Sequence, residues 1–166
     1  IIAGRESQSA SRVSDEILED SIEIIESNID DMNPEFFGHL MDRLFEDGAL
    51  DVSWIPVYMK KNRPGNMLRV LCKSDRREIL IHRILSESTT LGVRFYESRR
   101  RLLWRDHVEV ETSYGIIGVK RVKDLQGNIR IIPEYDVCQK IALEHDLPLR
   151  IVYETVAKEA AVRNED

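Results

Sequence analysis

Residues 25–35, Ile25-Glu26-Ser27-Asn28-Ile29-Asp30-Asp31-Met32-Asn33-Pro34-Glu35, form the stretch that the rest of the chain is organised around. A β-branched run, which is typical of a strand, ends there in two adjacent carboxylates. Asn33 and Pro34 fit the N-cap and the first position of a helix. The pattern predicts acidic groups where a strand is followed by a helix, which is a place for a cation or a polar ligand.

The residues around this stretch predict a strand and then an amphipathic helix. Ile22 to Ile29 is rich in β-branched residues, and from Phe36 to Phe45 the apolar residues recur at helical spacing. Gly48 follows as the C-terminal stop of the helix.

A hairpin and a second helix come next. Leu50 to Tyr58 and Met67 to Leu71 read as strands, and the basic segment between them, Lys60 to Asn66, contains the Pro-Gly pair typical of a turn. The following helix ends near Thr89 to Gly92, and Val93 begins a fourth strand. The apolar residues assigned to one face of that helix are Ile79, Leu80, Ile84 and Leu85.

The element order is therefore βαββαβ, which predicts an α+β fold with a ferredoxin-like core over residues 21–103. Right-handed crossovers make strands one and two run one way and strands three and four the other. The end of strand one (Asp30, Asp31), the basic turn (Lys60 to Asn66) and the start of strand four (Thr89 to Gly92) should then meet at one edge of the sheet.

The two ends of the chain are assigned separately. Residues 1–20 have no usable period and are interpreted as a disordered tail or linker remnant after a missing domain. Residues 104–166 are expected to form a β-meander and two helices packed on the core. Segments 95–103, 107–112 and 116–122 predict the strands of the meander, and the two helices are expected to open at Pro133-Glu134 and at Pro148.

Composition excludes several function classes. No apolar run approaches the roughly 20 residues needed to cross a bilayer, and no signal pattern is present, so we expect a cytoplasmic protein with no membrane partner. The net charge of −6 disfavours a nucleic acid polymer as partner. Cys72 and Cys138 lack metal-knuckle spacing and are interpreted as buried free thiols.

The acidic pair has two possible roles. Asp30 and Asp31 either favour the positive end of the first helix or bind a hard cation such as Mg²⁺ or Mn²⁺, which takes carboxylate and phosphate oxygens. Glu26 and Asn28 share one strand face and either orient these ligands or face water. We assign Asp30 and Asp31 as candidate metal ligands, and Glu26 and Asn28 as the residues that orient them.

The basic turn also has two interpretations. Lys60, Lys61 and Arg63 form either a solvated hairpin tip or a clamp for a polyphosphate. Their expected convergence with the acidic pair favours the clamp, because cations beside a metal are what a polyphosphate needs. The complete predicted nucleotide-binding set is Lys60, Lys61, Asn62, Arg63, Thr90 and Arg94.

Nucleophilic hydrolysis has no support in the sequence. His39, His82, His107 and His145 are scattered, and no Ser-His-Asp or Cys-His arrangement is visible. Catalytic residues therefore remain unassigned. Imidazole and thiolate groups are not clustered here, so this chain is not expected to supply a site for a soft or borderline metal.

Five separated runs resemble the C-terminal domain of the LarC family. They are residues 28–35, 59–65, 71–72 and 87–94, together with Pro133-Glu134-Tyr135 followed by Pro148-Leu149-Arg150. The resemblance covers about Ser21 to Ala157, and Ser27 and Ser88 stand where threonine is expected.

The resemblance implies a CTP-dependent nickel chelatase, or cyclometallase. Such a protein inserts nickel into pyridinium-3,5-bisthiocarboxylic acid mononucleotide to make the nickel-pincer cofactor of lactate racemase. It further implies binding of CTP and of Mg²⁺ or Mn²⁺, an N-terminal domain of the same protein as partner, and a homo-oligomer. The alternative is a non-catalytic nucleotide-binding or oligomerisation module, since fold alone does not separate the two.

Overall fold

The structure is a computed structural model that describes residues 17–162. The chain divides into two compact units, one over Glu19–Arg100 and one that combines Ile17 and Leu18 with the residues from Arg101 onward. Each unit has its own sheet and its own pair of helices. None of the described helices has the length and apolar character needed to cross a membrane.

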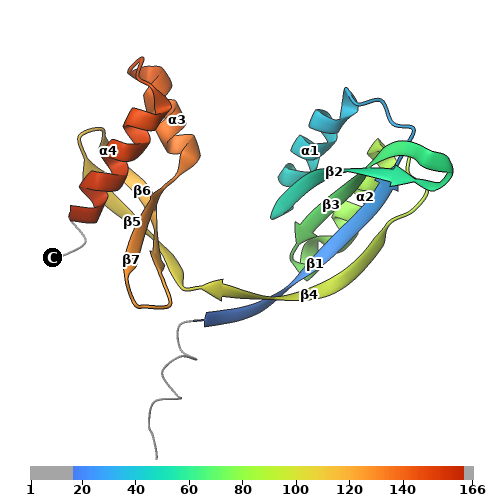
Figure 1. Cartoon of the computed structure of the whole chain (residues 1–166), viewed down its shortest axis with the longest axis horizontal. Coiled ribbons are helices and arrows are strands. Elements are labelled where there is room, and N and C mark those ends of the chain that lie inside the picture. The colour runs from blue at the N-terminus through green and yellow to red at the C-terminus, as the bar shows by residue number, and fades with distance from the viewer. Residues whose placement is uncertain (1–16, 163–166) are drawn as a thin grey trace, which may run out of the picture. The chain divides into compact units, whose positions relative to one another are not determined.

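The first unit has the βαββαβ order that the sequence predicts. The elements are β1 (Ile17–Ile29), α1 (Phe36–Glu46), β2 (Asp51–Met59), the 3₁₀ turn η1 (Lys60–Asn62), β3 (Arg63–Cys72), the 3₁₀ turn η2 (Ser74–Arg76), α2 (Arg77–Glu87) and β4 (Arg94–Leu103). The strand order is β2-β3-β1-β4, and β3 runs antiparallel to both β1 and β2 (Figure 1). The predicted α+β class with antiparallel sheets is confirmed.

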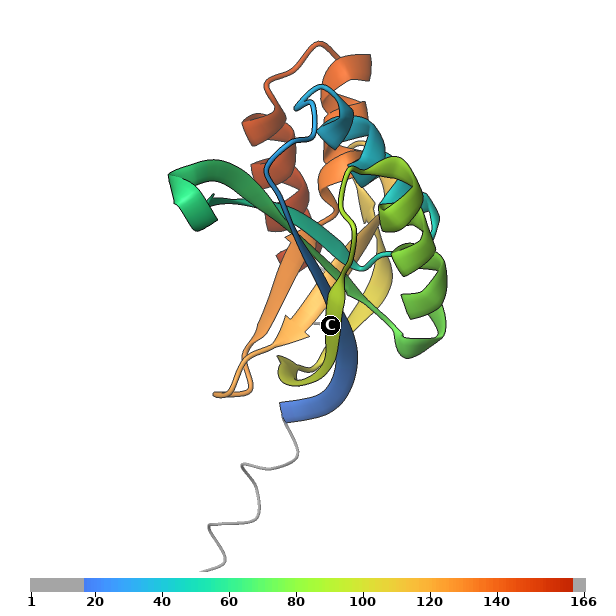
Figure 2. The same ribbon diagram turned by 90° about the vertical axis from the view of Figure 1, so that its right-hand side faces the viewer.

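Both helices of this unit pack on one face of the four-stranded sheet (Figure 2). The sheet contributes fully buried residues such as Ile25, Leu68 and Val70, and the helices contribute Leu40, Leu44, Leu80 and Ile84. Because side chains alternate along a strand, Glu26, Met67 and Arg69 point to the opposite, helix-free face.

The start of β1 and the buried face of α2 differ from the prediction. β1 begins at Ile17, so residues 17–20 of the predicted tail are strand, and the rest of that tail lies outside the described residues. An apolar pattern does not reveal this extension, because it contains charged residues. One of them, Asp20, accepts hydrogen bonds from Arg100 at 2.7 and 2.9 Å. On α2 the buried residues are Leu80 and Ile84, whereas Ile79 and Leu85, predicted for the same face, are exposed.

The second unit contains β5 (Arg105–Thr112), β6 (Gly115–Lys123), β7 (Ile129–Pro133), α3 (Tyr135–Glu144) and α4 (Leu149–Val162). β5, β6 and β7 form an antiparallel meander, and β4 continues through residues 95–103 as a strand of the first sheet instead of joining it. The sequence analysis missed β7. α3 and α4 follow the meander, as predicted. The packing of this extension on the core stays a prediction.

The core of the second unit forms between its sheet and its helices. Val110 and Val119 face Cys138, Val152 and Val156. Cys72 and Cys138 are free and buried, as predicted. Burial raises the pKa of the Cys72 thiol to about 11, so this thiol is poorly suited to act as a nucleophile or metal ligand.

Candidate functional site

The loop that carries the acidic pair joins the end of β1 to α1. The backbone N–H of Glu35 donates to Asn33 Oδ1 at 3.1 Å, and the N–H of Phe36 donates to the Asn33 carbonyl at 3.0 Å. Asn33 therefore closes a turn that precedes the helix, and α1 begins at Phe36 with Glu35 as its N-cap. The predicted N-cap at Asn33 and helix start at Pro34 are wrong by two residues, because the asparagine side chain serves the turn. At the other end Gly48, with φ of 100°, ends α1 as predicted.

The three segments that were predicted to share one sheet edge do lie together. β1 and β3 pair up to Ile29 and Asn66, which places the acidic pair directly beyond the paired strands. Arg63 Nη1 lies 3.4 Å from Asp30 Oδ2. On the other side, the hydroxyl of Thr89 donates to Asp31 Oδ1. The two carboxylates are therefore flanked by the basic hairpin and by the segment that leads into β4.

Gly65 makes the close approach of the hairpin to β1 possible. A Cβ atom at this position would lie 2.8 Å from the Ile29 carbonyl oxygen and 3.3 Å from the Asp30 Cα. Pro64 and Gly65 pair with Tyr58 and Val57 inside the strands. The hairpin connection lies within the predicted segment, Lys60 to Asn66, but Pro64 and Gly65 belong to β3 and not to the turn. The glycine is needed for contact with the acidic loop.

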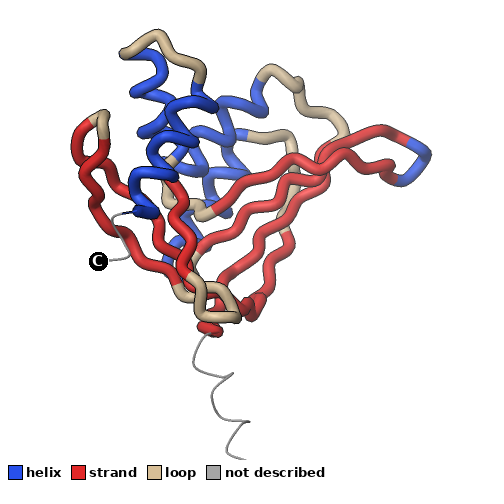
Figure 3. The backbone as a smooth tube through the Cα atoms, turned by 60° about the vertical axis from the view of Figure 1, so that its left-hand side comes forward, coloured by secondary structure: helices blue, strands red, loops and turns tan. Residues whose placement is uncertain are grey.

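The hairpin turn is instead the three-residue segment Lys60–Asn62. Lys61 and Asn62 have φ of 60° and 57°, so both adopt the left-handed conformation. Figure 3 shows the β2–β3 hairpin extending beyond the rest of its sheet with this turn at its tip. Residues 60–64 are exposed, and within residues 17–162 neither Lys60 nor Lys61 has a carboxylate partner. Two cationic groups at the tip of the hairpin therefore remain without a carboxylate partner among the described residues.

A hard cation fits the acidic pair only with help from a ligand. Asp30 and Asp31 each contact one donor, so carboxylate oxygens remain that a cation accepts. Within the described part of the chain, no group of three or more His, Cys, Asp or Glu residues is arranged to hold a metal. The donor set suits Mg²⁺ or Mn²⁺ that takes its other ligands from phosphate oxygens or water. It does not suit a closed structural metal site.

Thr90 is engaged inside the protein. Its hydroxyl lies 2.6 Å from Ser27 Oγ and 2.9 Å from the Gly92 carbonyl, to which Ser27 Oγ also donates at 3.0 Å. These bonds hold the start of β4 against β1. The neighbouring Thr89, which contacts Asp31, was not in the predicted set, although the segment that contains both was identified.

Arg94 lies on the helix-free face of the sheet, together with Glu26 and Asn28. Its Nε donates to Glu26 Oε2 at 2.9 Å, and its Nη2 donates to Asn28 Oδ1 at 3.3 Å. Arg69 donates from Nε to the other oxygen of Glu26 at 2.8 Å, and Tyr96 Oη lies 3.4 Å from that oxygen. Arg69 was not predicted as a site residue from the sequence. The feature that could have indicated it is a charged residue inside the apolar run that forms β3.

The carboxyl group of Glu26 is buried, with a side chain that is only 7% exposed, and its ionised form is stabilised by two arginines. Burial acts to raise the pKa of this carboxyl, but the hydrogen bonds and charges of Arg69 and Arg94 outweigh it and hold the pKa below its ordinary value. Because two guanidinium groups share one carboxylate, the cluster carries a net positive charge.

Two pockets flank the acidic loop. One, of about 380 Å³, is lined by Asp30 and Asn66 together with the apolar groups of Phe37, Pro56 and Pro64. The other, of about 420 Å³, lies on the α1–α2 side and is lined by Met32, Phe36, His39, Glu87 and Thr89. A ligand on the acidic pair therefore has space on both sides of the loop.

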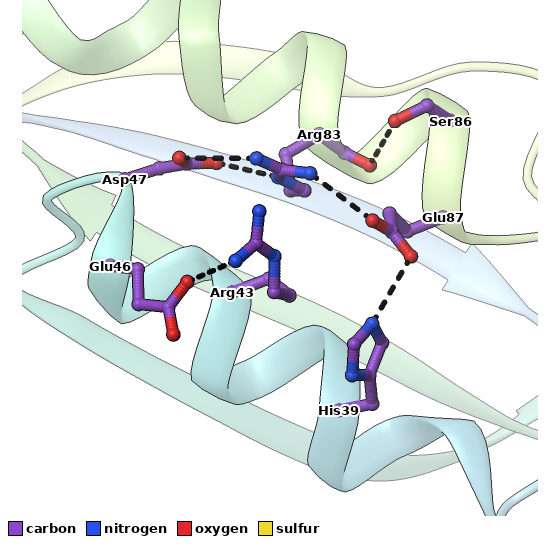
Figure 4. Close-up of polar contacts among 7 residues, drawn as sticks. All are labelled: His39, Arg43, Glu46, Asp47, Arg83, Ser86 and Glu87. Carbon is purple, nitrogen blue, oxygen red and sulfur yellow. Dashed lines mark hydrogen bonds and ion pairs between the residues drawn. The ribbon is translucent and has the colours of Figure 1, made fainter.

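A polar network between α1 and α2 borders the second pocket (Figure 4). Arg83 contacts Asp47 with Nε and Nη2 at 2.7 and 3.3 Å and Glu87 with Nη1 at 3.1 Å. Glu87 also lies 3.5 Å from His39 Nε2. The hydrogen bonds of Arg83 lower the pKa of Asp47. The network joins the two helices and fixes Glu87 at the pocket wall.

Comparison with known proteins adds a family and a solved relative. The model of a family described as "Nickel insertion protein" matches residues 6–153. A pyridinium-3,5-bisthiocarboxylic acid mononucleotide nickel insertion protein of Acetivibrio thermocellus is 46% identical over 154 residues, which is 91% of this chain and 38% of that protein. The protein of the same name from Thermotoga petrophila is 43% identical over 133 residues, 80% of this chain and 34% of that one.

A solved structure has the same fold. It is LarC2, the C-terminal domain of a cyclometallase involved in the synthesis of the NPN cofactor of lactate racemase, in its apo form. It superimposes with a TM-score of 0.77 at 35% identity, over 87% of this chain and 99% of that chain. The chain spans little more than a third of the length of the curated relatives it matches.

Proposed function

Because this chain belongs to the nickel insertion protein family, we propose that it is the CTP- and divalent-metal-binding C-terminal domain of a CTP-dependent nickel chelatase. The complete protein inserts nickel into pyridinium-3,5-bisthiocarboxylic acid mononucleotide, the substrate named for its relatives. Nickel is the cargo of this reaction, whereas Mg²⁺ or Mn²⁺ accompanies the nucleotide. The reaction takes place in the cytoplasm.

One observation carries the nucleotide assignment: two carboxylates lie between an exposed basic turn and a threonine-rich segment. Asp30 and Asp31 would hold Mg²⁺ or Mn²⁺, and the cation would bridge them to phosphate oxygens. Lys60, Lys61, Asn62 and Arg63 would contact the triphosphate. A cation on Asp30 would compete with the 3.4 Å contact to Arg63 and release that guanidinium for phosphate.

The remaining assigned residues support this set from the sheet. Thr90 orders the start of β4 through its contact with Ser27. Arg94 contacts Asn28 of β1, and Asn28 precedes Asp30 by two residues. At about 3.3 Å per strand residue, that is about 7 Å from the acidic pair. Glu26 and Asn28 orient Arg94 and thereby act behind the residues that touch ligand.

Nickel insertion requires more than the residues described. Solved LarC2 is by its name one domain of a larger cyclometallase, and the curated relatives are much longer than this chain. We therefore assign the nickel donor site to an N-terminal domain of the same protein, and we assign a homo-oligomer on the family resemblance. Light scattering of the purified chain measures the subunit number, and a monomer at micromolar concentration would contradict the oligomer.

The experiment that tests the nucleotide site is calorimetric titration of CTP in the presence of Mn²⁺. Replacing both acids, Asp30→Asn with Asp31→Asn, is expected to abolish metal-dependent CTP binding, because the cation loses both protein ligands. Asp42→Asn, an exposed acid on α1, is the matched control and should bind normally. Unchanged CTP affinity in the double variant would return the pair to a role at the helix terminus.

The alternative function is a non-catalytic nucleotide-binding or oligomerisation module. It is favoured by the lack of any His/Cys/Asp/Glu metal group among residues 17–162. Mixing the chain with precursor, CTP, Mg²⁺ and Ni²⁺, with and without the N-terminal domain, separates the two. Metallated cofactor, detected by mass spectrometry only when both parts are present and accompanied by CTP consumption, supports the enzyme. CTP binding without turnover in the complete mixture supports the alternative.

A further inference from the structure

The helix-free face of the four-stranded sheet carries a charge cluster around Glu26, behind the residues proposed to contact the triphosphate. Glu26 and Arg69 are directly opposite each other on β1 and β3, and Arg94 reaches the same carboxylate from β4. Glu26 is almost fully buried, yet the arginine side chains are 39% and 51% exposed. A buried carboxylate therefore holds two accessible guanidinium groups.

The arrangement leaves one positive charge uncompensated. Ser53 is the residue opposite Arg69 on its other neighbour, β2, so that strand supplies no carboxylate at this position. Glu26 binds each guanidinium through its Nε atom. Within residues 17–162 no hydrogen-bond partner is seen for the two terminal nitrogens of Arg69, or for Nη1 of Arg94.

Glu26 thus orients the two arginines as well as pairing with them. A guanidinium fixed through Nε keeps its terminal N–H groups directed away from that contact, in the fork that matches a carboxylate or phosphate. Tyr96, whose hydroxyl lies 3.4 Å from Glu26, and Met67, whose sulfur lies 3.1 Å from Arg94 Nη2, supply apolar surface beside them. Such a site suits an anionic group on a flat organic ligand.

We propose that Arg69 and Arg94 bind an anionic group, either a ring carboxylate-type substituent or the phosphate, of the mononucleotide that receives nickel. This inference rests on the proposed function, because that function supplies the identity of the ligand. Asn28 links the arginines to the acidic pair two residues further along β1, about 7 Å away. The precursor would then lie beside the metal-bound triphosphate without contacting Asp30, Asp31 or the hairpin cations.

The test uses the whole chain and two simple probes. Pyridine-3,5-dicarboxylate carries the ring anions, and inorganic phosphate represents the other source. We expect calorimetry to detect one of them, and Arg69→Met to weaken it about tenfold or more, since a charge-assisted hydrogen bond is lost while the apolar stem remains. Arg94→Met should have the same effect, and it serves as the second variant if Arg69→Met does not fold.

The matched control is Arg99→Met, another arginine of β4, which pairs with Glu19 and not with Glu26 among the described residues. It should leave probe binding unchanged. Arg69→Lys, which keeps the charge but loses the fork, should bind more weakly than the native chain and more tightly than Arg69→Met. The probe that binds more tightly identifies the anionic group.

Two results would overturn the inference: no binding of either probe to the native chain at millimolar concentration, or equal binding by Arg69→Met and the native chain. Asp30→Asn with Asp31→Asn is expected to keep the probe and lose CTP with Mn²⁺. Failure of the nucleotide site and failure of this second site are therefore separately visible.

Discussion

Glu26 is the residue whose environment differs most from an ordinary strand position. Burial would raise its pKa, but Arg69 and Arg94 hold the pKa below its ordinary value. A lowered pKa in the folded protein means that Glu26 adds stability above about pH 4.3, the ordinary pKa of glutamate. That contribution is lost as the pH falls through the lowered folded pKa.

The first expected outcome follows from this linkage. In urea titrations from pH 7 to pH 3, the native chain should lose more stability than Glu26→Gln, because the variant has no carboxyl to protonate at this position. Glu97→Gln, an exposed position on β4, is the control and should follow the native curve. Parallel curves for Glu26→Gln and the native chain would show that the arginines do not stabilise the ionised form.

Gly65 should be intolerant of a side chain. A Cβ atom would lie 2.8 Å from the Ile29 carbonyl and from Met59 Sδ, so Gly65→Ala must move the backbone at the acidic loop. We expect a loss of about 1–3 kcal/mol in the free energy of unfolding and weaker metal-dependent CTP binding.

Gly38 supplies the matched control for that substitution. It lies inside α1, and a Cβ atom there would meet nothing within 4 Å. Gly38→Ala should therefore raise stability by about 0.5–1 kcal/mol, the helical preference of alanine over glycine. Equal effects of the two substitutions would remove the packing explanation for Gly65.

The β2–β3 hairpin is the element that presents cations to the proposed triphosphate. Lys60 and Lys61 are exposed and Arg63 is close to Asp30. We expect a single substitution to alanine at any of the three to weaken CTP about ten- to 150-fold, the loss of one charge-assisted hydrogen bond of about 1.5–3 kcal/mol. Cytidine, which lacks phosphates, should bind each variant as it binds the native chain.

Lys73→Ala is the control for the hairpin, because Lys73 is an exposed lysine that follows β3 at the end opposite the turn. It should leave both ligands unchanged. Equal weakening of CTP and cytidine by the hairpin variants would mean that the turn does not contact phosphate.

The two units have separate cores, and each unit contains one tryptophan. Trp54 stacks on Phe37 in the first unit, with ring centroids 4.2 Å apart, and Trp104 lies beneath Arg121 in the second. Ile117 is 2% exposed in the second core. We expect Ile117→Ala to destabilise that unit by about 2–5 kcal/mol without moving the transition of the first.

The unfolding transition of each unit is measured separately by the fluorescence of single-tryptophan variants. Trp54→Phe leaves Trp104 to report the second unit, and Trp104→Phe leaves Trp54 to report the first. Ile25→Ala is the reciprocal control, since Ile25 is fully buried in the first core. If each core substitution shifts both fluorescence transitions equally, the units unfold as one cooperative structure.

Local pattern was enough to predict most elements but not their details. The βαββαβ order, the stop at Gly48 and the β5–β6 pair of the meander follow from periodicity and turn residues, which act within a few positions along the chain. The errors at Asn33 and at Pro64-Gly65 share one cause. Each residue type has two common uses, and tertiary neighbours decided between them: Asn33 closes a turn before α1, and Gly65 admits the Ile29 carbonyl.

The sequence by itself determined the topology and the composition of the candidate site: two carboxylates after β1, a basic hairpin and a threonine segment that topology brings to one edge. Only the tertiary structure decided which side chains meet. Thr89, not Thr90, reaches Asp31, and Arg69 joins Arg94 on Glu26. These contacts depend on the register between strands that are distant in sequence, and a shift of one residue would send every side chain to the other face.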